Sequence, residues 1–159
     1  MSSPDSAAIH QAVMRHSLSE VIQVLAAGGV ADVLDEGGRT PLFYAAKGGD
    51  AEIVFELIRH GANTNAQDKN LETPLHFAAR EYQILAAKYL IEGGANPNAQ
   101  DSHGNTPLWR AVFESRGRGD MIKLLLSAGA DKNLKNKHGS SPTDLANNIG
   151  NYELRAFLQ

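Results

Sequence analysis

The stretch Thr73-Pro74-Leu75-His76-Phe77-Ala78-Ala79, followed by Gly94-Ala95-Asn96-Pro97-Asn98, decides the fold of this chain. The same pattern begins one repeat earlier at Thr40-Pro41-Leu42 and one repeat later at Thr106-Pro107-Leu108. The threonines at positions 40, 73 and 106 are 33 residues apart. Self-similarity at a fixed period indicates a repeat architecture, in which each unit buries its apolar face against its neighbours. We therefore predict a stacked array of similar units.

Each copy carries its own turn and helix signals. An Asp-x-x-Gly turn, as at Asp35 to Gly38 and Asp101 to Gly104, ends in a glycine that can take a positive φ. Thr then stands at a helix N-cap, and Pro follows at the first helical position, where its missing N–H costs nothing. A second, more apolar helix ends at a left-handed glycine, expected at positions 28, 61, 94 and 129. The repeat therefore predicts an all-α fold of helix pairs.

The units at the two ends are expected to close the stack. Residues 7–16 and a segment from about Ser19 have helical apolar spacing but lack the Thr-Pro-Leu opening, and the last unit is truncated at its second helix. Degenerate end units suit a solenoid, because its ends have no neighbour to cover them. We predict one continuous domain with these units: 1–34, an N-terminal capping repeat; 35–67, 68–100 and 101–135, full repeats, the last with a two-residue insertion; 136–159, a C-terminal capping repeat.

From Asp35 to Asn133 the chain resembles the ankyrin repeat family, whose Thr-Pro-Leu-His-x-Ala signature matches Thr73 to Ala78. The resemblance implies a solenoid of stacked antiparallel helix pairs with short β-hairpin loops. It also implies a non-catalytic module that binds a protein partner on a concave surface and needs no cofactor. The alternative is a general adaptor or scaffold in a regulatory assembly.

The concave surface that the resemblance implies consists of the hairpin tips and the exposed side of the first helix of each pair. Aromatic and arginine side chains within a polar surround are typical of protein-binding patches. Tyr44 and Phe77 have an alternative role, which is to fill the space between adjacent repeats. Glu36, Gly37, Ser102, Glu114, Lys137, His138 and Ser140 belong to the same surface. The predicted partner-binding residues are Arg39, Tyr44, Lys47, Lys69, Asn70, Leu71, Glu72, Phe77, Arg80, Glu81, His103, Asn105, Trp109, Arg110 and Phe113.

The second and third repeats depart from the common pattern. Leu71 stands where the turn glycine is expected, and Tyr82 where the glycine between the helices is expected. At Leu71, either the turn has changed its geometry or the leucine is an exposed apolar contact for the partner. In the third repeat the extra residues fall within 113–119, between two helices, and insertions in repeat arrays map to loops that often bind.

A second resemblance concerns residues Gly139 to Phe157, which are similar to the C-terminus of small, free-standing bacterial ankyrin proteins. Some proteins of that kind are immunity proteins for secreted antibacterial toxins. The length of the chain, with no second domain expected, fits this class. The resemblance implies a toxin as the partner, with the groove covering its active site or blocking its movement.

The amino-acid composition excludes several kinds of chemistry and of binding partner. The 159 residues include no cysteine, which excludes disulfides and thiolate chemistry. A net charge of −3 without a block of Lys and Arg argues against binding to nucleic acid or a membrane surface. No apolar run approaches the roughly 18 residues of a membrane helix, and the first six residues lack the features of a secretory signal. We expect a cytoplasmic protein that is a monomer on its own.

The sequence shows no pattern typical of an active site or a metal site. The six histidines are scattered, without a His-Glu-x-x-His motif or a paired-carboxylate cluster. The family resemblance implies that His76 bonds the Thr73 hydroxyl and neighbouring backbone. Trp109 takes the place of that histidine in the next repeat and is expected to be more exposed. We therefore predict no enzyme activity, no metal and no cofactor.

Overall fold

The computed structural model describes residues 4–150 and 152–159. Residues 1–3 of the expected N-terminal cap and Asn151 of the C-terminal cap lie outside the described residues. The described chain contains no strand. Its helices are α1 (Pro4–Met14), α2 (Leu18–Ala26), α3 (Pro41–Gly48), α4 (Ala51–Arg59), α5 (Pro74–Glu81), α6 (Ile84–Glu92), α7 (Pro107–Phe113), α8 (Asp120–Ser127), α9 (Pro142–Ile149) and α10 (Tyr152–Leu158).

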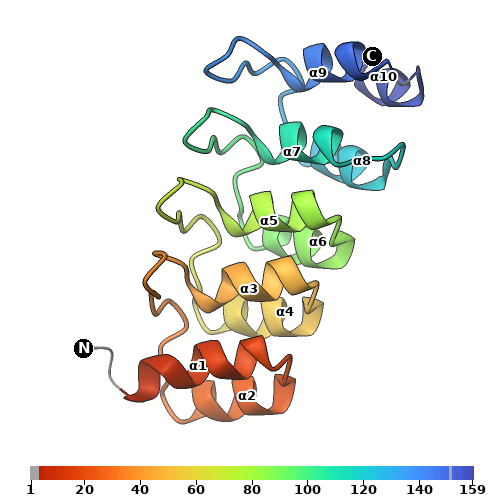
Figure 1. Ribbon diagram of the computed structural model, residues 1–159. Coiled ribbons are helices and arrows are strands. Elements are labelled where there is room, and N and C mark those ends of the chain that lie inside the picture. The colour runs from red at the N-terminus through yellow and green to blue at the C-terminus, as the bar shows by residue number, and fades with distance from the viewer. Residues whose placement is uncertain (1–3, 151) are drawn as a thin grey trace.

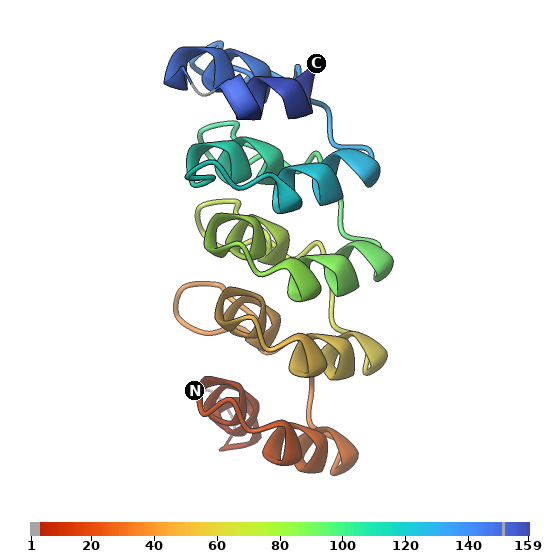
Figure 2. The ribbon, with the colours of Figure 1, turned by 90° about the vertical axis from the view of Figure 1, so that its right-hand side faces the viewer.

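The helices form two layers that run the length of the array (Figure 1). Helices α1, α3, α5, α7 and α9 pack side by side in the first layer. Helices α2, α4, α6 and α8 pack in the second layer, with α10 at its end. Seen from the side, one antiparallel helix pair lies above the next, with the two termini at opposite ends of the stack (Figure 2). The predicted all-α solenoid of helix pairs is confirmed.

Burial repeats along the chain with the sequence motif. The leucine of each Thr-Pro-Leu triplet is fully buried, and so is the alanine three residues after it. Small residues at that point let neighbouring first-layer helices approach closely. The larger apolar side chains come from the second layer, where α4, α6 and α8 each contribute one fully buried leucine. The buried residues are Leu42, Leu75 and Leu108, then Ala45, Ala78 and Ala111, and from the second layer Leu57, Leu90 and Leu125.

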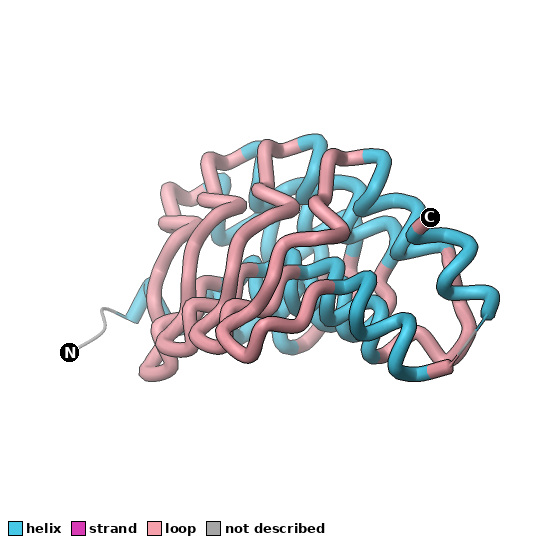
Figure 3. Tube along the Cα trace, turned by 90° about the horizontal axis from the view of Figure 1, so that it is seen from above, coloured by secondary structure: helices cyan, strands magenta, loops and turns pink. Residues whose placement is uncertain are grey.

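The connections between units are turns stacked along one edge of the array (Figure 3). In each turn one side-chain Oδ1 accepts two backbone N–H groups, two and four residues further on, at Asp35, Asp68, Asp101 and Asn136. Backbone bonds also join each tip to the next. The Lys69 N–H donates to the Gly37 carbonyl at 3.3 Å. The Ser102 N–H donates to the Asn70 carbonyl at 2.8 Å, and the Lys137 N–H to the His103 carbonyl at 2.9 Å. The tips therefore form one continuous platform.

A second series of hydrogen bonds between units involves the last asparagine of the Gly-Ala-Asn-x-Asn pattern. Asn65 accepts the N–H of Asn96 at 2.7 Å and donates to the carbonyl of Gly94 at 2.9 Å. Asn98 repeats this arrangement one unit later, with Asp131 N–H at 2.7 Å and the Gly129 carbonyl at 3.0 Å. Each asparagine side chain thus satisfies an N–H and a carbonyl of the loop that follows the second helix of the next unit.

Most helix ends follow the sequence. Thr106 and Ser141 accept the N–H of the residue three positions on, each at 3.1 Å, as an N-cap does. The Thr40 hydroxyl is buried and has no hydrogen-bond partner among the described residues, so the expected side-chain cap is absent there. The glycines expected to end the second helices, at 28, 61, 94 and 129, have φ between 85° and 92°, which confirms their left-handed role.

His76 is a structural residue that ties two repeats together. Its Nδ1 accepts the Thr73 backbone N–H at 3.1 Å and lies 2.9 Å from the Thr73 hydroxyl. Its Nε2 lies 2.9 Å from the carbonyl of Asn105 in the next repeat, and because a carbonyl only accepts, Nε2 carries the proton. Burial lowers the pKa of His76 to about 4. The expected bonding of this histidine is confirmed.

This depressed pKa predicts a loss of stability on mild acidification. The folded pKa of about 4 lies below the ordinary value of 6.5, so the unfolded chain takes up this proton first as the pH falls. His76 should therefore remove about 2 kcal/mol from the free energy of unfolding between about pH 7 and pH 5. Urea unfolding at the two pH values measures the drop. In His76→Gln, which has no titrating group at this position, the drop should be smaller by that amount; an equal drop would contradict the assignment.

Candidate protein-binding surface

Two of the arginines predicted for the concave surface are held by buried carboxylates. Arg80 Nη1 lies 3.0 Å from Glu72 Oε1, and Arg110 Nη2 lies 3.5 Å from the same oxygen and 2.6 Å from Asp101 Oδ2. Burial alone would raise the pKa of Asp101, but the Asn105 N–H and the Arg110 guanidinium help to hold that pKa below its ordinary value. Glu72 therefore links the second repeat to the third, and both cations are neutralised within the protein.

Phe77 lies beneath the arginines and is only 4% exposed. Its ring packs edge-to-face on Phe43 with centroids 5.6 Å apart, and the guanidinium carbons of Arg39 and Arg80 lie 5.0 and 4.5 Å from its centroid. Arg39 in turn pairs with Asp68, whose Oδ2 lies 3.0 Å from Nε. Phe77 thus fills space between adjacent repeats, which is the alternative role that the sequence left open.

Tyr44 and Asn105 are also engaged inside the protein. Tyr44 is half-buried, and its hydroxyl donates to Asp35 Oδ2. Asn105 is buried, and its Oδ1 accepts from Asn136 Nδ2 at 2.8 Å. These two side chains, like Glu72 and Phe77, stabilise the platform of the tips and the first helices.

The remaining predicted residues lie on the surface. Trp109 is half-buried and, as expected, more exposed than His76. Its ring stacks on that of Phe113, with centroids 5.4 Å apart and an interplanar angle of 11°, and Phe113 itself is 55% exposed. The pair gives the end of α7 an exposed apolar face. The exposed members of the predicted set are Lys47, Lys69, Asn70, Leu71, Glu81, His103 and Phe113.

Leu71 adopts a strained backbone. Its φ of 57° lies in the left-handed region, where Gly38, Gly104 and Gly139 occupy the equivalent turn position with φ of 76–78°. The turn has therefore kept its geometry, and the expectation that it changes is wrong. A leucine in this region costs about 1–2 kcal/mol, and here the side chain stays 45% exposed. Leu71 is thus an exposed apolar residue at a position that favours glycine.

Tyr82 shows how such strain is offset elsewhere in the same repeat. Its φ is 58°, where α3 and α9 end in glycine. Its hydroxyl donates to the Ala111 carbonyl at 2.7 Å and also lies 3.1 Å from the Arg118 carbonyl oxygen. The Arg118 guanidinium carbon lies 4.0 Å from the Tyr82 ring centroid. Burial raises the pKa of Tyr82 to about 12. Tyr82 therefore anchors the inserted loop of the third repeat.

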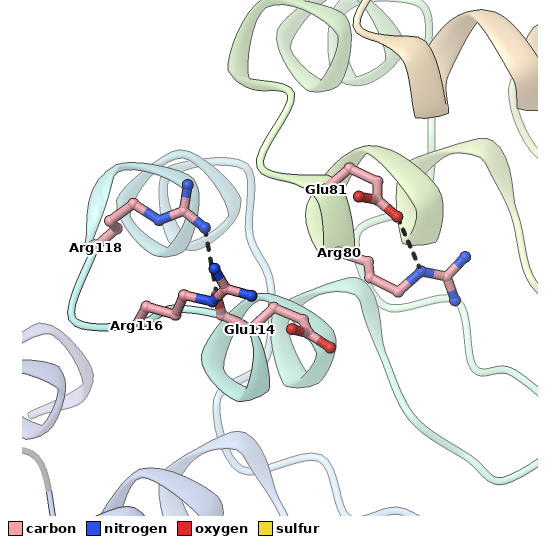
Figure 4. A pocket seen from close by; sticks show the side chains of 5 residues that line it. All are labelled: Arg80, Glu81, Glu114, Arg116 and Arg118. Atoms are coloured by element: carbon pink, nitrogen blue, oxygen red, sulfur yellow. Dashed lines mark hydrogen bonds and ion pairs between the residues drawn. The ribbon is translucent and has the colours of Figure 1, made fainter.

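The inserted loop, residues 114–119, borders a recess of about 270 Å³. Figure 4 shows Arg80 and Glu81 on α5, with Glu114, Arg116 and Arg118 on the segment after α7. Arg118 donates to the carbonyls of Ser115 at 3.2 Å and Glu114 at 3.4 Å, so it closes the C-terminal end of α7. Arg116 is exposed and forms no ion pair with a described residue.

Asp68 and Asp101 are site residues that the sequence did not reveal. The Asp-x-x-Gly pattern indicates the turn that Oδ1 makes, and nothing in it indicates that Oδ2 pairs with an arginine. The arginines stand at different positions within their repeats, so the pattern carries no periodic signal for the pairing. Only the three-dimensional stacking of the tips brings these groups together.

Among residues 4–150 and 152–159, no three His, Asp or Glu side chains are placed to hold a metal ion. Within the same ranges, no helix is long and apolar enough to cross a membrane.

Stacked helix pairs, linked tips and an exposed surface on the first helices define a helical repeat protein of the interaction type. The family model for ankyrin repeats in three copies matches residues 9–101 and residues 47–136. The chain therefore belongs to the ankyrin repeat family, and it is a protein–protein interaction module. A comparison with curated proteins found no match.

The strain at Leu71 predicts that Leu71→Gly stabilises the free protein. Relief of about 1–2 kcal/mol of strain exceeds the entropy that glycine adds to the unfolded chain, so the gain should be roughly 0.5–1 kcal/mol. Urea unfolding of the two proteins measures it. Leu71→Ala is the control, because it removes most of the side chain and keeps the strained Cβ, and it should bring no gain. A loss of stability in Leu71→Gly would show that leucine packing outweighs the strain.

Proposed function

We propose that the chain binds a protein partner on its concave surface, through the exposed tips and the exposed end of α7. The observation that carries this proposal is Leu71, which is strained and exposed in the free protein. Strain of this kind is found where surrounding structure or function requires it. At Tyr82 the side chain makes hydrogen bonds that offset the strain. At Leu71 the turn holds the backbone but leaves the side chain 45% exposed, which supports a contact with a partner.

The rigidity of the platform supports the same proposal. The tips are joined by backbone hydrogen bonds, and the arginines behind them are held by carboxylates. A preformed surface loses little conformational entropy on binding. An interface of about 800 Å² per partner would extend over two or three repeats. In this proposal Arg39, Arg80 and Arg110 hold the surface in shape, and the exposed side chains make the contacts.

The proposal contains no catalytic step and no cofactor. Membership of the ankyrin repeat family supports this, because such repeats act as interaction modules. A cytoplasmic location and a monomeric free state remain predictions from composition.

Two versions differ in the identity of the partner. In the narrower version, the chain is a bacterial immunity protein and the partner is a toxin; this rests only on the similarity of residues 139–157 to small bacterial ankyrin proteins. In the alternative, the chain is an adaptor that joins a regulatory assembly. The activity of a captured partner separates them, because an immunity protein inhibits its partner and an adaptor does not.

Photo-crosslinking from two matched positions tests the binding surface. Phe113 and Phe55 are both exposed phenylalanines, at 55% and 45%, but Phe113 ends α7 in the first layer and Phe55 lies on α4 in the second. Each is replaced by p-benzoylphenylalanine in cells that naturally produce the protein, which are then irradiated. We expect one discrete cross-linked protein from position 113 and none from position 55.

Mass spectrometry identifies the cross-linked protein, and its activity with and without the purified chain separates toxin from assembly component. Cross-links from position 55 alone, or from neither position, would overturn the concave-surface proposal.

A further inference from the structure

Two of the three exposed tips from the second repeat onward carry a lysine, and none of the three carries an exposed carboxylate. The tip residues are 69–71, 102–104 and 137–139, which we call the tip row. Lys69 and Lys137 occupy equivalent positions two units apart, with Ser102 between them, and both lysines are exposed. In the first unit Glu36 takes the same position, so the first tip lies outside this cationic row. The aspartates that begin the second and third tips are buried, at 4% and 3% exposure.

The tip-row lysines have no carboxylate partner among the described residues, whereas the arginines behind them do. Neither Lys69 nor Lys137 forms an ion pair with a described residue. Arg39, Arg80 and Arg110 each lie within 3.0 Å of a carboxylate oxygen. The tip row therefore carries positive charge that no described carboxylate neutralises.

The tip row is also held in a fixed arrangement. Ser102 donates to the Asn70 carbonyl and Lys137 to the His103 carbonyl, so the three tips are linked in register. Leu71 places an exposed apolar side chain beside Lys69 in the second tip. A recess of about 180 Å³ opens between the second and third tips. Asn70, Ser102 and His103 line it together with the paired side chains Glu72, Arg80, Asp101 and Arg110. Charge, an apolar contact and a recess are thus combined on one rigid surface.

We propose that the tip row binds an acidic segment of the partner protein, with carboxylates on Lys69 and Lys137 and an aliphatic side chain on Leu71. This inference rests on the proposed function and names the chemistry of the partner's contact surface. Complementary charge of this kind mainly raises the association rate and selects the partner. Added salt screens the attraction and so weakens it. A nucleic acid fits the row less well, because two lysines on a chain of net charge −3 fall short of the roughly 6–10 phosphate contacts of strong nucleic-acid binders.

Selection from a random peptide library displayed on phage, with the full chain as bait, tests this chemistry. We expect the selected peptides to be rich in Asp and Glu and to contain an aliphatic residue. Their Kd for the double variant Lys69→Glu/Lys137→Glu should be at least about tenfold higher than for the natural chain, since each contact becomes repulsive. Added NaCl should weaken binding to the natural chain.

The matched control is Arg59→Glu/Lys88→Glu, which changes the net charge by the same amount at exposed positions on α4 and α6. It should leave the Kd within about twofold, because Arg59 and Lys88 lie away from the tips and take part only in surface ion pairs with Glu56 and Glu92. Thermal unfolding of both double variants confirms that each remains folded.

Three results would overturn the inference. The selected peptides could lack acidic residues, they could bind the Lys69→Glu/Lys137→Glu variant as tightly as the natural chain, or oligo-deoxythymidylate could bind the tips more tightly than the peptides do. A cross-link from position 113 that persists in this variant overturns the tip-row inference and leaves the proposed function standing. Absence of a partner at position 113 in the natural chain overturns the proposed function itself.

Discussion

Buried carboxylates that each serve two partners hold the concave surface of this array together. Asp68 uses Oδ1 to accept two backbone N–H groups of its own turn and Oδ2 to pair with Arg39 of the preceding unit. Asp101 does the same with its own turn and Arg110, and Glu72 joins that arginine to the second repeat. Turn geometry, contact between repeats and neutralisation of the arginines therefore depend on the same few oxygens. Burying these carboxylates is favourable only because both kinds of partner are present.

This arrangement divides the surface into two sets of residues. The inner set, the arginines with Phe77 and Asn105, is engaged within the protein and keeps the tips in place. The outer set, Leu71, Phe113 and the tip lysines, has no comparable internal partner among the described residues, although Phe113 stacks on Trp109. Residues of the outer set can change their contacts when a partner arrives without disturbing the fold. A protein-binding surface needs this combination of a rigid support and free side chains.

Most of the fold could be predicted from the sequence because the signals of a repeat are local. A threonine before a proline begins a helix, and a glycine such as Gly94 ends one, whatever the neighbouring unit contains. The pairing of the arginines could not be predicted, since it depends on side chains that are distant in sequence and stand at different repeat positions. Phe77 is buried for a similar reason, because Arg39 from the first turn and Arg80 from α5 cover its ring. Leu71 was misjudged in one respect: the hydrogen bonds of its turn hold the backbone in the glycine conformation despite the side chain.

The claim that these carboxylates hold the surface together is tested most directly by the free energy of unfolding of Glu72→Gln, measured in urea beside Glu81→Gln. Both changes remove one negative charge near Arg80, but Glu72 is buried and Glu81 is exposed. Loss of the buried partner should lower the free energy of unfolding by roughly 2–4 kcal/mol, and loss of the exposed one by less than about 0.5 kcal/mol. Equal and small losses would contradict the claim, and would make Arg80 and Arg110 free side chains that a partner can bind directly.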